Sequence, residues 1–180
     1  WNRFQSEHTN EAILDRVVKI NVPYVLELEQ EIKIYEKILG RSNFDAHIAP
    51  HTLRVASMFS VLSRLKDSQK CDPLTKLKLY NGEEVVEKGR VKKIDIRDLR
   101  DEAPNEGMKG ISTRFIMKAV DNALSDSDRD FITPISIMDS LIRQVKDQII
   151  DREFQDKCLG LIRNVVRNEY LRILENEIAK

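Results

Sequence analysis

The stretch from Glu106 to Leu124 constrains the fold most strongly, because its apolar residues recur every three or four positions. These residues are Phe115, Ile116, Ala119, Val120, Ala123 and Leu124. This spacing places them on one face of a helix, so the sequence predicts an amphipathic helix over residues 111–124 that buries that face. Ser112 is the expected N-cap, since its hydroxyl can accept a hydrogen bond from an amide in the first turn.

Arg114 falls in the first turn of this predicted helix and is the first candidate functional residue. The positive end of the helix dipole disfavours a cation there unless an anion lies opposite. One interpretation is a solvated surface arginine, or one paired with a nearby carboxylate. The other is an arginine that binds a phosphate brought by another part of the protein. Gly107 and Gly110 leave the approach to the helix without bulk and free to take positive φ.

The same periodicity predicts a mainly α-helical chain. Further helices are expected over 26–40, 50–66, from Pro134 to Ile149 and over about 152–178. Thr133 and Pro134 have the residue types of an N-cap and a first helical position. The intervening residues 67–105 are the least regular part, and we interpret them as an insertion with short helices near Leu74–Leu79 and Ile94–Arg100. Residues 125–130 are polar and predict a loop.

Residues 17–22 are β-branched or apolar at nearly every position and predict a strand covered on both faces. A short helix over 11–16 is expected before it, and Pro23 ends it. A lone strand is not stable, so its neighbours are expected from other sequence or another chain. The chain also begins at Trp1 inside a polar, helix-like stretch. We therefore expect it to be a fragment of a longer protein.

Composition excludes several classes of function. The 180 residues contain 30 basic and 30 acidic side chains, which argues against a general nucleic-acid surface. No apolar run approaches the roughly 20 residues that cross a bilayer, so no membrane partner is expected. The two cysteines, Cys71 and Cys158, are far apart and are expected to be reduced thiols of a cytoplasmic protein.

The sequence contains no self-contained catalytic motif. A phosphate loop of the form G-x-x-x-x-G-K-[ST] is absent, as are the protein-kinase motifs His-Arg-Asp and Asp-Phe-Gly. His47 and His51 are four residues apart, but Pro50 between them favours a loop or a helix start over a zinc site. We therefore predict no metal ligands in this chain.

The order of predicted elements resembles the last strand and the helical lid of an AAA+ ATPase. In that superfamily an arginine before the last strand often acts as a finger toward the nucleotide of the neighbouring subunit, and Glu11-Ala-Ile-Leu-Asp-Arg16 is similar to that pattern. A second-sensor arginine at the start of a lid helix contacts the γ-phosphate, and Gly110-Ile-Ser-Thr-Arg114 is similar to that one. Phe131-Ile-Thr-Pro134 looks like the usual opening of the last lid helix.

More specifically, several motifs resemble the bacterial PrkA family of serine protein kinases. They are Asp15-Arg-Val, Val22-Pro-Tyr24, Glu31-Ile-Lys-Ile-Tyr-Glu-Lys37, Ala46-His-Ile-Ala-Pro-His-Thr-Leu53, Met58-Phe-Ser-Val-Leu62, Glu102-Ala-Pro104 and Glu106-Gly-Met-Lys-Gly-Ile-Ser-Thr-Arg-Phe115. These motifs span most of residues 11–124 and are specific in combination. The last third of the chain matches the family by pattern rather than by motif.

The resemblance implies how the chain is organised. Residues 1–23 would be the end of an AAA+ α/β core that retains one short β-strand. Residues 24–130 would be a helical AAA+ lid-type bundle with the insertion at 67–105. Residues 131–180 would be the last lid helix and a C-terminal helix that leads to a kinase-like region.

It also implies a role for particular residues. Arg114 would sense the γ-phosphate, with Gly110 and Ser112 beside the nucleotide, and Arg16 would be the finger. ATP and Mg would be bound mostly by residues outside this chain, which lacks both Walker motifs and would be inactive alone. The expected partners are ATP, a protein substrate and further copies in a homo-oligomer. The competing hypothesis is a non-enzymatic helical module for oligomerisation or partner docking.

Overall fold

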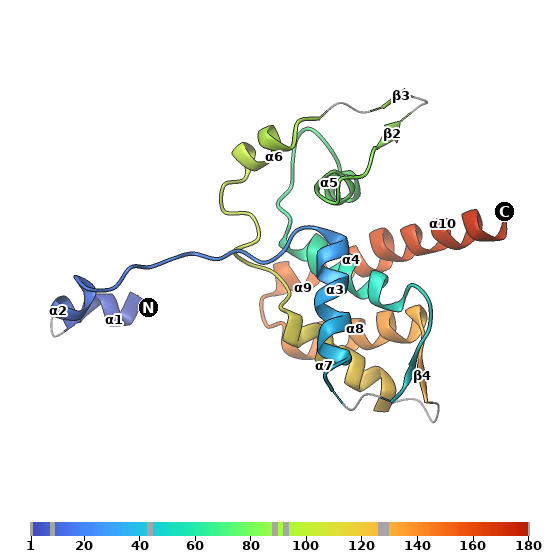
Figure 1. The fold of residues 1–180 in the computed structure, drawn as a ribbon, viewed down its shortest axis with the longest axis horizontal. Helices are drawn as coiled ribbons and strands as arrows, with labels where there is room; N and C mark the ends of the chain where they lie inside the picture. The colour runs from blue at the N-terminus through green and yellow to red at the C-terminus, as the bar shows by residue number, and fades with distance from the viewer. Residues whose placement is uncertain are drawn as a thin grey trace.

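The computed structural model describes residues 2–7, 10–42, 45–87, 90–91, 94–125 and 130–179, which are mainly α-helical. Figure 1 shows a central group of helices, a smaller lobe above it that contains α5 and α6, and a long C-terminal helix. The N-terminal helices α1 (Asn2–Ser6) and α2 (Glu11–Leu14) lie at the far end of an extended segment, away from the central helices. The mainly α-helical fold that the sequence predicts is confirmed.

Four helices form the central group, and the sequence predicted each of them within a few residues. They are α3 (Leu28–Leu39), α4 (Thr52–Arg64), α7 (Thr113–Ser125) and α8 (Pro134–Gln148). Helix α4 is the innermost, because every residue from Val55 to Arg64 is buried. It packs against α3 and α8, and α8 packs against α7. Phe59 and Met58 are among its largest fully buried side chains.

The start of α8 follows the predicted capping pattern. The Thr133 hydroxyl accepts a hydrogen bond from the Ser136 amide at 3.1 Å, and the Ser136 hydroxyl accepts one from the Thr133 amide at 2.8 Å. This reciprocal arrangement is a capping box, and Pro134 follows at the first helical position. Just before it, β4 (Phe131–Ile132) pairs in parallel with β1 (His47–Ile48). The sequence did not indicate this two-stranded pair. Residues 126–129 of the predicted loop lie outside the described residues.

The region interpreted as an insertion has the two predicted short helices, α5 (Pro73–Tyr80) and α6 (Ile96–Glu102). The Asp72 carboxylate caps α5 by accepting hydrogen bonds from the amides of Leu74 and Thr75, both at 3.0 Å. Between the helices lies an antiparallel pair, β2 (Val86–Glu87) and β3 (Arg90–Val91), which the sequence did not indicate.

The C-terminal segment was predicted as one helix over 152–178, and the structure has a continuous helical segment with these bounds whose middle part is a π-helix. It comprises α9 (Arg152–Gly160), the π-helix η2 (Leu161–Val166) and α10 (Arg167–Ile178). Leu161 and Val166 are both buried, and η2 packs against α4. Their separation of five positions matches the i→i+5 hydrogen bonding of a π-helix, so the wider turn brings both side chains to the core. No described helix combines the length and apolar character needed to cross a membrane.

The strand predicted over residues 17–22 is not formed. This segment has neither helix nor strand structure, and Val18, Ile20 and Val22 are 84%, 77% and 79% exposed. A strand needs a neighbour for its backbone hydrogen bonds, and the strands among the described residues pair only with one another. The apolar residues of this segment therefore remain on the surface. The short helix before it ends at Leu14, two residues earlier than predicted.

Candidate functional site

Arg114 lies in the first turn of α7, where the sequence placed it, and its side chain is exposed. It makes no hydrogen bond or ion pair with any residue that the structure describes. The Ser112 hydroxyl accepts a hydrogen bond from the Phe115 amide at 3.3 Å, which confirms Ser112 as the N-cap. Arg114 therefore does not pair with a carboxylate of the described residues, and two interpretations remain: a solvated surface arginine, or one that binds an external anion.

Two glycines hold the approach to α7 against the end of α4. Gly107 has φ of 79° and Gly110 has φ of 128°, so both use the freedom to take positive φ that glycine provides. A Cβ on Gly110 would lie 2.7 Å from Cγ of Arg64 and 2.9 Å from its Cα. The Gly107 carbonyl accepts a hydrogen bond from the Tyr24 amide at 2.9 Å. Gly110 thus serves close packing; a role beside a nucleotide stays a prediction.

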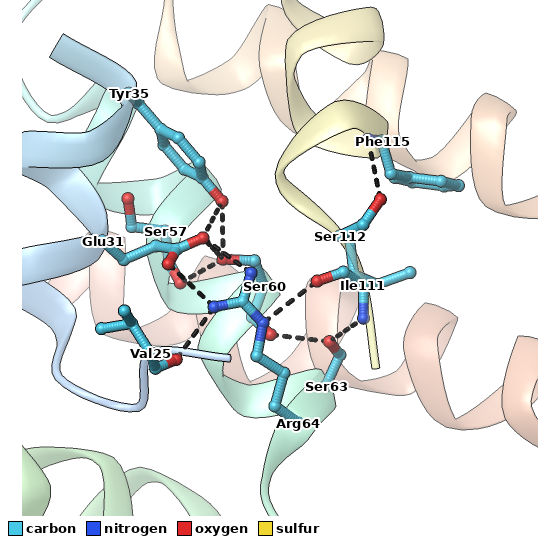
Figure 2. Close-up of polar contacts among 10 residues, drawn as sticks. All are labelled: Val25, Glu31, Tyr35, Ser57, Ser60, Ser63, Arg64, Ile111, Ser112 and Phe115. Atoms are coloured by element: carbon cyan, nitrogen blue, oxygen red, sulfur yellow. Dashed lines mark hydrogen bonds and ion pairs between the residues drawn. The ribbon is translucent and has the colours of Figure 1, made fainter. Parts of the chain in front are cut away.

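Arg64, at the end of α4, holds this approach through a buried ion pair. Figure 2 shows its guanidinium facing the Glu31 carboxylate of α3, with Nη1–Oε2 and Nη2–Oε1 distances of 2.8 and 2.7 Å. Its Nε donates to the Ile111 carbonyl at 3.0 Å, and Nη1 also donates to the Val25 carbonyl at 2.9 Å. One side chain therefore joins α3, α4, the segment before α3 and the residue before Ser112.

Hydroxyl groups complete this buried network. The Tyr35 hydroxyl donates to the Glu31 carboxylate at 2.5 Å, and the Ser63 hydroxyl accepts from the Ile111 amide at 2.9 Å. Burial, together with the adjacent Glu31 carboxylate, raises the pKa of Tyr35 far above its ordinary value, so the phenol stays protonated. The amide and the carbonyl of Ile111 are thus both hydrogen-bonded to side chains of α4. These bonds fix the position of the start of α7, which carries Arg114.

A second buried cluster surrounds Glu106 at the other end of the approach. Its carboxylate accepts hydrogen bonds from the Lys66 amide at 2.6 Å, from Lys76 Nζ at 2.7 Å and from the Tyr80 hydroxyl at 2.7 Å. Burial and this carboxylate raise the pKa of Tyr80. The cluster attaches α5 to the loop that leads to Arg114.

Neither Arg64 nor Glu106 was predicted from the sequence to be part of the site. Arg64 ends a helix in which apolar residues and serines alternate, and nothing in this pattern distinguishes it from a surface arginine. Its partner Glu31 lies 33 positions earlier. The one available signal was local: Glu106 and Gly110 stand together in the stretch that precedes Arg114.

Arg16, the other predicted site residue, lies apart from Arg114. It is exposed and lies two residues after the end of α2, a helix that Figure 1 shows at the far end of the extended segment. The structure therefore does not bring the two arginines into one site within this chain.

The histidines and cysteines have separate surroundings. His51 is the N-cap residue of α4, as Pro50 suggested, and its Nε2 lies 3.0 Å from Oε1 of Glu177. His47 lies in β1. Among the described residues, no group of three or more histidine, cysteine or acidic side chains could hold a metal ion. Cys71 and Cys158 are buried thiols that form no disulfide, and burial raises the pKa of Cys158 to about 12.

Two family models match the chain, and the boundary between them lies at the start of α5. Residues 1–72 match the model of the PrkA AAA domain, and residues 74–180 match that of the PrkA serine protein kinase C-terminal domain. The chain belongs to the PrkA family. The second match includes α7 with Arg114 as well as the last third of the chain, where the motifs themselves indicated the family only loosely.

Curated relatives of this PrkA-family chain carry two different names. It is 35% identical over 185 residues to the ATP-dependent protease PrkA of Bacillus subtilis (strain 168). It is 34% identical over 181 residues to the serine/threonine kinase YeaG of Escherichia coli (strain K12). The alignments cover 100% and 99% of this chain but only 28% of each relative. No solved structure matches the chain.

Proposed function

We propose that this PrkA-family chain is the nucleotide-sensing lid portion of an ATP-dependent serine protein kinase, and that Arg114 binds the γ-phosphate of ATP. The observation that supports the proposal is the exposed guanidinium of Arg114, which has no partner among the described residues and lies on a helix start that two buried networks hold in place. A preorganised cation aimed at developing negative charge is the arrangement that phosphoryl transfer requires.

The neighbouring residues have distinct parts in this proposal. Ser112 caps the helix and so sets the direction in which Arg114 leaves it. Gly110 lets the chain approach α4 closely enough for this geometry. The amides at the N-terminus of α7 add a partial positive charge that favours a bound anion. Magnesium and most contacts to the nucleotide would come from residues outside this chain.

The buried Arg64–Glu31 pair supports a mechanism for lid movement. Arg64 also holds the Val25 carbonyl, in the segment that enters the lid from residues 1–23. A movement of Arg114 toward a bound γ-phosphate would therefore also displace that segment, because Ile111 and Arg64 connect the two. ATP would favour the closed lid because only that position lets Arg114 reach the phosphate.

Arg16 and the exposed segment after it would act outside the lid. We propose that residues 17–22 pair with the sheet of an ATPase core and that Arg16 reaches the nucleotide of a neighbouring subunit in a homo-oligomer. The exposure of Val18, Ile20 and Val22 supports this, because such apolar surface is normally covered. An arginine supplied across a subunit boundary couples hydrolysis to assembly.

The test is ATP turnover by the complete protein that carries this segment. Arg114→Ala should lower turnover by about 10²-fold or more, with nucleotide binding retained, and Arg114→Lys should recover little because lysine lacks the guanidinium fork. Lys118→Ala is the matched control, since Lys118 is exposed one turn later on α7. Unchanged turnover in Arg114→Ala would favour the alternative, a non-enzymatic module for oligomerisation or docking.

The name of the Bacillus subtilis relative, an ATP-dependent protease, favours a second candidate function. A lid that senses ATP serves either chemistry, so the two are separated by the fate of the protein substrate. With labelled ATP and casein, a kinase transfers the γ-phosphate to intact casein, whereas a protease yields casein fragments and no labelled casein. Kinase activity is the first proposal because the C-terminal family match names a serine protein kinase.

A further inference from the structure

A large open cavity lies away from Arg114, between α3 and the insertion. Its volume is about 670 Å³, within the usual range for ligand pockets. The segment before α3 forms one wall, and the end of α6 forms another. Tyr24, Leu26, Ile34 and Pro104 give these walls an apolar character.

Three cationic side chains from two elements line this cavity. Lys33 and Lys37 lie one turn apart on α3, and Arg100 belongs to α6 on the other side. All three are exposed, and none makes a hydrogen bond or ion pair with the described residues. Like charges that share a cavity repel each other, and a bound anion would relieve that repulsion.

The acidic residues of the lining do not neutralise these cations. The Glu106 carboxylate is already bonded to Lys76 and Tyr80. Glu27 is the one remaining carboxylate among the lining residues, and its side chain makes no capping bond to α3. Three free cations therefore face one free carboxylate, which leaves an excess of two positive charges.

We propose that this cavity binds a phosphoserine or phosphothreonine side chain of a protein, with an apolar neighbour of that residue against Tyr24, Leu26 and Ile34. A phosphorylated hydroxyl carries about −1.5 to −2 charge at pH 7, which matches the excess in the cavity. Arginine and lysine clusters are the usual receptors of such groups. The inference rests on the proposed kinase activity, whose product is such a side chain. The cavity would retain the phosphorylated protein product.

The experiment uses the 180-residue chain in the absence of ATP. Fluorescence anisotropy would compare a labelled short peptide that carries one phosphoserine between leucines with the same peptide that carries serine. The phosphopeptide should bind at least about tenfold more tightly, as expected for charge-assisted bonds to phosphate. Lys33→Gln and Arg100→Gln should each weaken its binding by about tenfold.

Two controls remove exposed cations that do not line the cavity. Lys118→Gln on α7 and Arg152→Gln on α9 should leave phosphopeptide binding unchanged, with circular dichroism used to verify the fold of every variant. The proposal would be overturned if the two peptides bound equally or if neither bound. It would also be overturned if the Arg100→Gln variant bound the phosphopeptide as tightly as the wild type.

ATP is the competing occupant. If ATP displaced the phosphopeptide and its own binding also required Arg100, the cavity would be a nucleotide site and the proposal would be wrong. Because this assay needs neither turnover nor Arg114, it separates a failure of this inference from a failure of the proposed lid function.

Discussion

The Glu31 carboxylate and the Arg64 guanidinium form a two-point ion pair whose side chains are 1% and 0% exposed. Removing two charges from water is costly, and here the cost is offset by further bonds from Arg64 to two carbonyls and from Tyr35 to the carboxylate. Such a pair adds little stability over an apolar replacement, but it leaves an uncompensated charge when one partner is removed. In the proposed lid, this pair connects the segment before α3, at Val25, with the start of α7, at Ile111.

The first prediction concerns this pair. Arg64→Met should lower the free energy of unfolding by about 3–5 kcal/mol, because Glu31 would remain buried without its partner. Arg54→Met is the matched control. Arg54 also forms an ion pair, with Glu29 at 2.7 Å, but both side chains are partly exposed. Loss of this pair should therefore lower the free energy of unfolding by only about 0–1 kcal/mol. Urea denaturation measures both values, and equal losses would contradict the prediction.

A second prediction tests whether Gly110 is required for close packing. Gly110→Ala should destabilise the chain by about 1–3 kcal/mol, because its φ is 128° and the new Cβ would press on the backbone of Arg64. Gly160→Ala should instead stabilise it by about 0.5–1 kcal/mol, since Gly160 is helical and a Cβ there meets nothing within 4 Å. Thermal unfolding should show shifts of opposite sign; a lower melting temperature for both variants would contradict this argument.

The third prediction is an acid-dependent loss of stability through Glu169. Burial alone would raise the pKa of this carboxyl, but hydrogen bonds and charge from Arg172 and Lys78 lower it overall. A carboxyl with a lowered folded pKa stabilises the protein above its unfolded pKa of about 4.3, and this contribution disappears as the pH falls through the folded value.

Glu169→Gln should therefore reduce stability at pH 7 by about 1.5–3 kcal/mol and should lose less stability than the wild type on acidification. Melting temperatures measured from pH 7 to pH 3 would give both curves. Parallel curves would show that Glu169 has no part in acid unfolding. Lys78 lies on α5 and Glu169 on α10, so the same variant also tests how the insertion is attached to the C-terminal helix.

The fourth prediction concerns the reactivity of Cys158. With a pKa raised to about 12 by burial, the thiolate fraction at pH 8 is about one in ten thousand. In a Cys71→Ser variant, iodoacetamide should therefore modify Cys158 much more slowly in the folded protein than in urea. Mass spectrometry over time gives both rates, and similar rates in the two conditions would show that the thiol is accessible.

Much of the helical framework could be predicted because its signals are local. Three-and-four spacing indicated α3, α4, α7 and α8, and Thr133 with Pro134 marked the start of α8 to the residue. The short strands β1 and β4 could not be predicted in this way. Their pairing joins residues more than eighty positions apart, and two residues are too few to show a period.

Residues 17–22 show that a composition typical of strands does not by itself predict that a strand forms. A run of β-branched residues is suited to a strand but supplies no partner for its backbone groups. Within the described chain, the segment therefore stays extended and exposed.

For the candidate site, the sequence by itself determined the cap at Ser112, the freedom of Gly107 and Gly110 to take positive φ, and the position of Arg114 in a first turn. These features depend on the conformational preferences of a few adjacent residues. Only the tertiary structure decided that Arg114 has no partner among the described residues, that Arg16 lies far from it, and that Arg64, Glu31 and Glu106 hold the loop between the helices. Burial of a charge becomes favourable only when its partner is in place, and that partner comes from a segment distant in the sequence.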